Sequence, residues 1–217
     1  MKPLTITFVD NKFHLEGYPD AEKVVALAHP KAAWFTDLAL HKNDLDFAAD
    51  SLDGISRTSG ELTFLQQVFW RSAIIHFMKC FDGSASRVPL DANTLYGAEA
   101  VALQEYDQFR KLRNKHFVHD ENAWLQCHAA IVLNKKGADP EVADVGYLAF
   151  RIQTLNKGSF GNLWLLVTRA RSWVVQELER VHATILSDLA KSDGDSLRRL
   201  PDIQYRPPTF AEIGRKK

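Results

Sequence analysis

The chain has 217 residues, of which 46% are hydrophobic, 25% are charged and 11% are aromatic. Lysine plus arginine and aspartate plus glutamate both number 27, so the formal net charge is zero. This apolar fraction without net charge excludes an intrinsically disordered chain. Zero net charge also excludes a general electrostatic attraction to nucleic acid or to an anionic membrane. A polyanionic ligand would therefore need a local cluster of cations.

Cysteine usage and hydropathy indicate an intracellular protein. Cys80 and Cys127 are the only cysteines, and both lie in apolar contexts that are typical of reduced, buried thiols. The first residues, MKPLTITFVDNKFHLEG, lack the apolar run of a signal peptide. No stretch approaches 18 uninterrupted apolar residues, so we expect no transmembrane helix. We therefore expect a cytoplasmic protein with no membrane partner.

The first half of the chain shows mostly helical periodicity. Residues 1–19 alternate weakly and predict a short strand or an ordered arm. Helical patterns run from about residue 20 to 28 and from about 30 to 48, and the stretch SLDGISRTSG then predicts a break. Residues 61–81 are apolar on most sides, which is typical of a helix at the centre of a bundle. A long helix is expected from about Thr94 to Val118.

After Glu121 the hydrophobic period changes from helical to two, which predicts a β-hairpin at about 125–152 with Gly137 and Pro140 in its turn. A helix of some 30 residues follows from about Ser159 to Ala190. Its apolar stripe advances by steps of three and four: Leu163, Val167, Ala170, Val174, Leu178, Val181, Ile185 and Leu189. We expect one mainly helical domain over residues 20–191 with an inserted hairpin, and an extended tail over 192–217.

One short segment carries chemical information. Residues 109–124 read FRKLRNKHFVHDENAW, and from Arg110 to His119 there are four fixed positive charges, two histidines and no acid. In an α-helix one face would hold Ala102, Tyr106, Phe109, Arg113 and Phe117. Arg113 therefore occupies an apolar position, where an unpaired charge is costly. Its partner is expected to be an internal carboxylate, such as Glu105 or Asp120, or a bound phosphate, which suits the planar guanidinium.

His119 follows Arg113 by six residues, about 9 Å along a helix axis. This separation excludes direct contact but suits a pair that brackets one phosphodiester, or a site that a second chain completes. The spacing alone is no evidence, because 13 arginines and 8 histidines produce such pairs by chance, as with Arg71 and His76. A metal site made of His116, His119, Asp120 and His128 is a weaker alternative, since no HExxH or cysteine-pair pattern accompanies it.

The string RNKHFVHD resembles the R-N/D/H-x(3–5)-H signature of the HEPN superfamily, the higher eukaryotes and prokaryotes nucleotide-binding domains. Over RNKxxxH it is most similar to the RNKxxxHxD form of HEPN-like proteins in bacterial phage-defence and toxin–antitoxin systems. The resemblance implies a mainly α, HEPN-like helical bundle that tolerates an inserted β-hairpin. It further implies a homodimer, or a dimer with an antitoxin partner, that acts as a metal-independent endoribonuclease without a cofactor.

The resemblance also implies roles for individual residues. His119 would act as general base or acid on the RNA 2′-hydroxyl or the leaving oxygen, because histidine titrates near neutrality. Arg113 would hold the scissile phosphate and stabilise its developing charge, and Asn114 would orient the site. Arg110, Lys115 and His116 are candidates for RNA binding. The alternative is a non-catalytic HEPN-like module that binds a nucleotide, an RNA or a protein partner.

Overall fold

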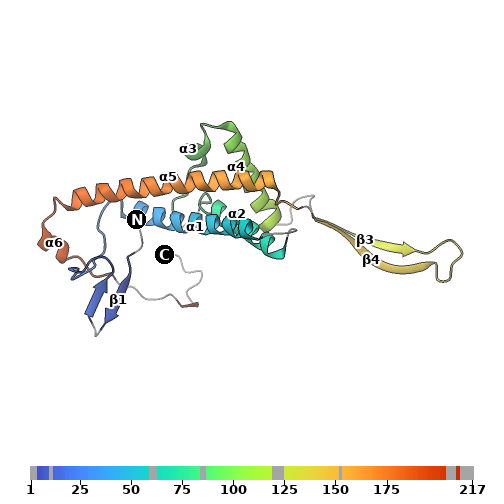
Figure 1. The fold of residues 1–217 in the computed structure, drawn as a ribbon, viewed down its shortest axis with the longest axis horizontal. Helices are drawn as coiled ribbons and strands as arrows, with labels where there is room; N and C mark the ends of the chain where they lie inside the picture. Colours follow the sequence, from blue (N-terminus) through green and yellow to red (C-terminus); the bar gives the residue numbers. More distant parts are fainter. Residues whose placement is uncertain are drawn as a thin grey trace. The chain divides into compact units, whose positions relative to one another are not determined.

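The computed structural model describes residues 4–9, 12–58, 63–83, 87–118, 125–151, 153–203 and 209–210. It is mainly helical, with two antiparallel hairpins (Figure 1). The elements are β1 (Ile6–Val9), β2 (Lys12–Leu15), α1 (Ala32–Arg57), α2 (Phe64–Lys79), α3 (Ala92–Tyr96), α4 (Ala100–Leu112), the π-helical segment η1 (Arg113–Val118), β3 (Leu125–Leu133), β4 (Val142–Arg151), α5 (Lys157–Leu189) and α6 (Gly194–Arg198). Among these described residues, every helix is too short or too polar to cross a bilayer.

The chain forms two compact units, each assembled from separate stretches. The first unit contains Met1–Asn43, Gly83–Pro89 and Arg171–Lys217, and the second contains Asp44–Asp82 and Leu90–Ala170. The division falls within α1 and α5, the two longest helices, so each helix contributes one end to each unit. The candidate site over residues 109–124 belongs to the second unit.

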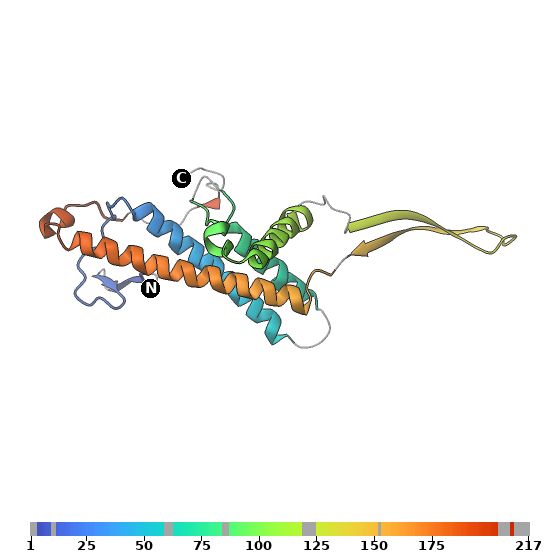
Figure 2. The same cartoon turned by 90° about the horizontal axis from the view of Figure 1, so that it is seen from above.

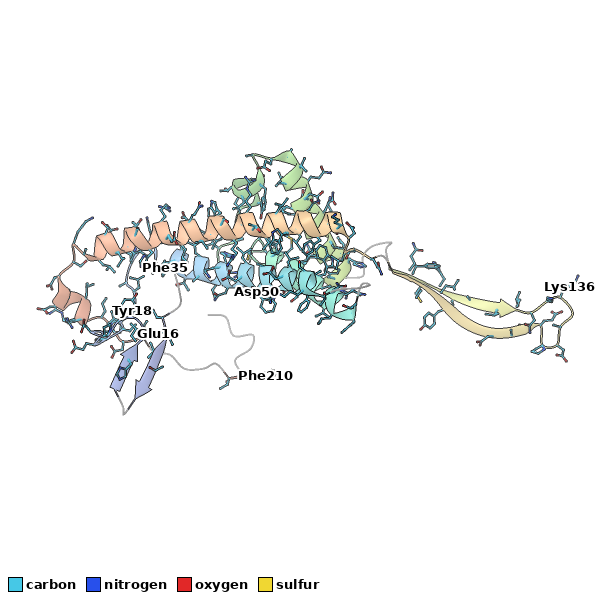
Figure 3. The ribbon with its side chains drawn as sticks, in the orientation of Figure 1. Glu16, Tyr18, Phe35, Asp50, Lys136 and Phe210 are labelled. Carbon is cyan, nitrogen blue, oxygen red and sulfur yellow. The ribbon has the colours of Figure 1, made fainter. Side chains whose placement is uncertain are left out.

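In the first unit, the start of α1 runs antiparallel to the end of α5, as Figures 1 and 2 both show. The indole Nε1 of Trp34 donates a hydrogen bond to Glu177 Oε1 at 3.2 Å. One turn further along α5, the rings of Phe35 and His182 stack with centroids 6.3 Å apart (Phe35 is labelled in Figure 3). Between these polar contacts, the apolar stripe of α5 is buried, which stabilises the helix pair.

The predicted helix at residues 20–28 is wrong. This segment is extended: Val25 forms a bridge with Asp202, and the N–H of Ala26 donates to the carbonyl of Pro201 at 2.9 Å. Lys23 Nζ lies 3.2 Å from the carboxylate of Asp202. A nine-residue helix is only marginally stable alone, and Pro30 disfavours a helical conformation in the residue before it. Extended pairing with the segment at Pro201 and Asp202 is therefore favoured over a helix.

The sequence predicted an extended C-terminal tail, but the described part of this segment is not extended throughout. Residues Gly194–Arg198 form the short helix α6, whose first turn is capped by Asp193. The Asp193 carboxylate accepts hydrogen bonds from the backbone N–H groups of Asp195 and Ser196. The hydroxyl of Ser196, which also donates to this carboxylate, and then these backbone bonds hold the pKa of Asp193 below its usual value.

In the second unit, α1 ends at Arg57, inside the stretch SLDGISRTSG where the sequence predicts a break, but it continues past the first glycine of that stretch. Gly54 causes no break, because it lies against the ring of Phe69 on α2: a Cβ built on Gly54 would be 2.9 Å from that ring. The helix α2 then begins with a capping box in which Thr63 and Gln66 exchange side-chain and backbone hydrogen bonds. Gly54 is therefore a position of close helix packing. The break between the two helices begins after it and ends at the capped start of α2.

Aromatic side chains form the core of the second unit. The rings of Trp70 and Phe109 meet edge to face with centroids 5.9 Å apart, and Phe77 meets Tyr106 at 6.4 Å. These contacts pack α2 against α4. The sequence predicted that this helix lies at the centre of a bundle, but one face of α2 is exposed and carries Phe64, Leu65, Val68 and Ile75.

Two further predictions from periodicity are confirmed. Helix α5 spans Lys157–Leu189, and its stripe is buried from Leu163 to Ile185, while the last predicted position, Leu189, is only partly buried. The predicted hairpin is formed by β3 and β4, which pair from Leu125 opposite Arg151 to Leu133 opposite Val142. Figure 3 labels Lys136 in the turn between them. Both cysteines are free thiols, but Cys127 on β3 is exposed rather than buried, because no described element covers it.

Candidate functional site

The motif RNKHFV forms the π-helical segment η1, which continues α4 directly. A π-helical turn pairs residues five apart instead of four, is rare, and occurs frequently at functional sites. The segment predicted as one helix up to Val118 is helical over most of its length, but it is interrupted after Tyr96. From Arg113 onward its helical period is wider than that of an α-helix. Beyond this point, the four-residue step that placed Phe117 on the face of Arg113 no longer applies.

The guanidinium of Arg113 is fixed by two polar neighbours. Its Nη1 donates to Oδ1 of Asn114 at 2.7 Å, and its Nη2 lies 3.0 Å from Oδ2 of Asp82 in an ion pair. The side chains of Arg113 and Asp82 are 29% and 36% exposed, although the Oδ2 atom of Asp82 that faces Arg113 is itself buried. The Nε atom of Arg113 is buried and has no hydrogen-bond partner within the described part of the chain. The guanidinium of Arg113 is therefore a half-buried cation with a fixed orientation.

The carboxylate beside Arg113 differs from the expected ones. Within the described residues its partner is Asp82, not Glu105, while Asp120 lies outside those residues. Asp82 follows the end of α2, where its backbone N–H still donates to the carbonyl of Met78 at 3.2 Å. The requirement for an anion was thus correct, but the anion comes from a different helix.

Asn114 lies where it can orient Arg113. In a regular α-helix consecutive residues point about 100° apart, and adjacent side chains do not face each other. In η1 the amide oxygen of Asn114 nevertheless accepts a hydrogen bond from the guanidinium of Arg113. The polar position after the arginine therefore has a direct contact with it, and its amide oxygen favours one orientation of the guanidinium.

The remaining predicted residues lie on α4 and η1. Arg110 Nε is 3.8 Å from the carboxylate of Asp107, one turn earlier, and Lys115 is exposed. His116 is partly buried, with its ring centroid 5.5 Å from that of Phe117. His119 lies outside the described residues, so its proposed catalytic position rests on the sequence alone.

Arg71 is a neighbour of the site that the sequence did not indicate. Its guanidinium lies over the ring of Phe117, 5.2 Å from the ring centroid, in a cation–π contact. The other member of the chance pair, His76, contacts Asp44 at 2.9 Å instead. A charged residue within the apolar helix α2 was the available signal, but its partner could not be found without the fold.

A buried aromatic residue, Tyr106, lies beneath the charged groups. Burial is the main reason that the pKa of Tyr106 is raised above its usual value. The nearby Arg110 acts in the opposite direction, and the negative charge of Asp82 adds to the increase. The ring of Tyr106 packs against that of Phe81 with centroids 5.0 Å apart. The charged side chains near Tyr106 therefore lie next to tightly packed aromatic rings, which limit their movement.

Metal-ligating groups do not cluster in the described ranges: no three His, Cys, Asp or Glu side chains there could hold one ion together. Of the four residues considered for a metal site, His116 and His128 are described, whereas His119 and Asp120 are not.

Comparison with known proteins gives no relative for this chain: no family model, no curated protein and no solved structure matches it. The structure itself establishes a mainly helical protein with two hairpins. The resemblance of RNKHFVHD to the HEPN signature remains a prediction from the sequence.

Proposed function

We propose that the chain is a metal-independent endoribonuclease of HEPN type, acting in the cytoplasm as a homodimer in phage defence or as the toxin of a toxin–antitoxin pair. The observation that carries the proposal is the fixed guanidinium of Arg113. It is partly exposed, stands at a π-helical turn, and is hydrogen-bonded by the next residue of the motif, Asn114. A cation preorganised in this way suits the stabilisation of charge that develops on a phosphate.

The reaction needs no group beyond the chain's own side chains. One base takes the proton of the RNA 2′-hydroxyl, and the freed oxygen attacks the adjacent phosphorus. The bond from phosphorus to the 5′-oxygen breaks, and that oxygen takes up a proton. The products are a 2′,3′-cyclic phosphate and a 5′-hydroxyl. We assign the proton transfers to His119, and the stabilisation of the non-bridging phosphate oxygens to Arg113.

Local charge supports contact with an RNA backbone. Arg71 and Arg110 add guanidinium groups to the second unit, and Lys115 adds an exposed ammonium group. Asp82 and Asp107 offset part of this charge. Because the whole chain is neutral, binding should be restricted to this site, and few counterions should be released when RNA binds.

The ion pair between Arg113 and Asp82 favours a second candidate function. A carboxylate already occupies part of the guanidinium where a phosphate would bind. In this case the chain is a non-catalytic HEPN-like module that binds a nucleotide, an RNA or a protein partner. Such a module would retain partner binding but show no RNA turnover.

Cleavage of RNA in the presence of EDTA tests the proposal. The wild type should cleave, and both His119→Ala and Arg113→Ala should lower the rate by at least about 100-fold, within the range for loss of a proton-transfer group or a charge-stabilising donor. His14→Ala, an exposed histidine of the N-terminal hairpin, is the matched control and should keep full activity. Full activity in both site variants would overturn the proposal. Binding without turnover in the wild type would favour the second candidate.

A further inference from the structure

From Cys127 to Leu133 on β3, and in the paired part of β4, the hairpin has one face of uncharged, mostly apolar side chains. Only the pair at its base, Leu125 opposite Arg151, adds a charged residue at the same parity. Residues that are opposite each other in an antiparallel pair point to the same side, so the register defines this face. Its members, named here the apolar face, are Cys127, Ala129, Ile131, Leu133, Val142, Val145, Tyr147 and Ala149. The opposite face is mixed and includes Gln126, His128 and Asp144.

The apolar face is exposed, although its alternation is typical of a half-buried strand. Its five large side chains are between 50% and 75% exposed, Val142 the least and Tyr147 the most. Within the described residues, β3 and β4 pair only with each other. An isolated two-stranded hairpin is at best marginally stable in water. The sequence therefore has the pattern of a hairpin with one buried face, but within the described residues of one chain nothing covers that face.

The outer edge of strand β3 carries neither a charged residue nor a proline. Strand β3 reads LQCHAAIVL and contains no lysine, arginine, aspartate, glutamate or proline over its nine residues. Monomeric proteins commonly place charges or proline on such edges. This omission indicates that the hairpin meets another surface.

We propose that the apolar face packs against the same face of a second copy of this chain, with the two hairpins antiparallel about a two-fold axis. Because all eight members of the face are uncharged, self-association brings no like charges together. At roughly 180 Å² per large apolar residue, the exposed part of the five large side chains is about 600 Å² per chain. Two copies reach about 1,200 Å², the lower limit of standard interfaces.

The distribution of side-chain size also favours a second copy. One pair in from the base of the hairpin, the apolar face holds the small Cys127 and Ala149, whereas near the turn it holds Ile131, Leu133 and Val145. An antiparallel arrangement places the large half of one hairpin over the small half of the other. Ala129 opposite Tyr147 is the third of the five pairs that run at this parity from Leu125–Arg151 to Leu133–Val142, and it then lies at the two-fold axis.

Light scattering on the full chain tests this inference, which does not depend on the ribonuclease proposal. At about 100 μM, where even a micromolar dimer is well populated, the wild type should be dimeric. Ile131→Asp should weaken the dimer by at least about 100-fold, because it buries an unpaired carboxylate. Val132→Asp is the matched control: it is adjacent, similarly exposed and on the opposite face, and should remain dimeric. A monomeric wild type, or a dimeric Ile131→Asp, would overturn the inference.

Cysteine cross-linking decides the case in which both aspartate variants are monomeric because the hairpin unfolds. In a Cys127→Ser background, where the remaining Cys80 is buried, Ala129→Cys should form a disulfide-linked dimer on oxidation. Ala130→Cys, on the opposite face, should not. Equal cross-linking of the two variants, or none in either, would contradict the proposed interface.

Discussion

Arg113 and Asp82 form an ion pair, with Nη2 and Oδ2 3.0 Å apart, that joins the motif on η1 to the end of α2. The pair couples the candidate site to the end of the helix that supplies Trp70 and Phe77 to the unit's aromatic core. It also sets a balance, because the same carboxylate that orients the guanidinium competes with a phosphate for it.

Removing the charge of Asp82 should strengthen RNA binding. A partly exposed ion pair is worth about 0.2–1 kcal/mol, so Asp82→Asn should raise the affinity for single-stranded RNA by up to about fivefold. Fluorescence anisotropy with a labelled RNA measures the change. Asp50→Asn, an exposed aspartate on α1 that Figure 3 labels, makes the same charge change as a control. Weaker binding in Asp82→Asn alone would show that Asp82 acts only by orienting Arg113.

Asn114 should act through its amide oxygen. Asn114→Ala removes the hydrogen bond to Arg113 and should weaken RNA binding by about 1 kcal/mol, the usual contribution of such a bond. Asn114→Asp keeps the acceptor but adds a negative charge beside the bound phosphate, so it should weaken binding further. Titrations at low and high salt separate the two effects, since only the added charge is screened. Equal affinities for both variants at low salt would contradict this role.

The core of the second unit should depend strongly on Phe77. This side chain is fully buried, and Phe77→Ala should lower the free energy of unfolding by about 3–5 kcal/mol. Phe64, on the same helix, is 81% exposed, so Phe64→Ala should change it by no more than about 0.5 kcal/mol. Urea unfolding measures both values. Comparable losses in the two variants would mean that the exposed face of α2 is covered in solution.

Stability should fall at alkaline pH because of Tyr96. Burial raises the pKa of Tyr96 well above its usual value, and its hydroxyl donates to the carbonyl of Leu166 at 2.9 Å. Above about pH 10 the unfolded chain loses this proton while the folded chain keeps it. The free energy of unfolding should therefore be constant below this pH and then fall by up to about 1.4 kcal/mol per pH unit for this group.

Tyr96→Phe provides the comparison for the alkaline effect. The variant should be less stable near neutrality by about 1 kcal/mol, because it loses the hydrogen bond to Leu166. Its stability should then decline less steeply between pH 10 and 11 than that of the wild type. Tyr106, whose pKa is also raised, keeps a residual slope in the variant. Parallel profiles for the two proteins would exclude Tyr96 as the source.

Periodicity predicted the parts of the fold that local pattern determines. The stripe on α5 was recovered because its burial follows from steps of three and four residues. The hairpin was recovered because the period of two is distinct from a helical one. Gly54 was misinterpreted, since a glycine that admits the ring of Phe69 looks the same in sequence as one that breaks a helix.

The site was predicted only in part, for a similar reason. The apolar position of Arg113 indicated that an anion must lie beside it, but its identity depended on where α2 ends. The contact of Arg71 with Phe117 likewise depends on helix packing. The widening of the helix at η1 has no sequence signal that we recognise, and it altered the phase from which side-chain directions were predicted.

The ends of the RNA fragments test the central claim most directly. After incubation with the wild-type protein and EDTA, fragments should carry 2′,3′-cyclic phosphate and 5′-hydroxyl ends, because the 2′-oxygen displaces the 5′-oxygen. The same RNA should remain intact with His119→Ala, and an RNA methylated on its 2′-oxygens should remain intact with the wild type. Fragments with 5′-phosphate ends, or cleavage that persists in His119→Ala, would contradict the account.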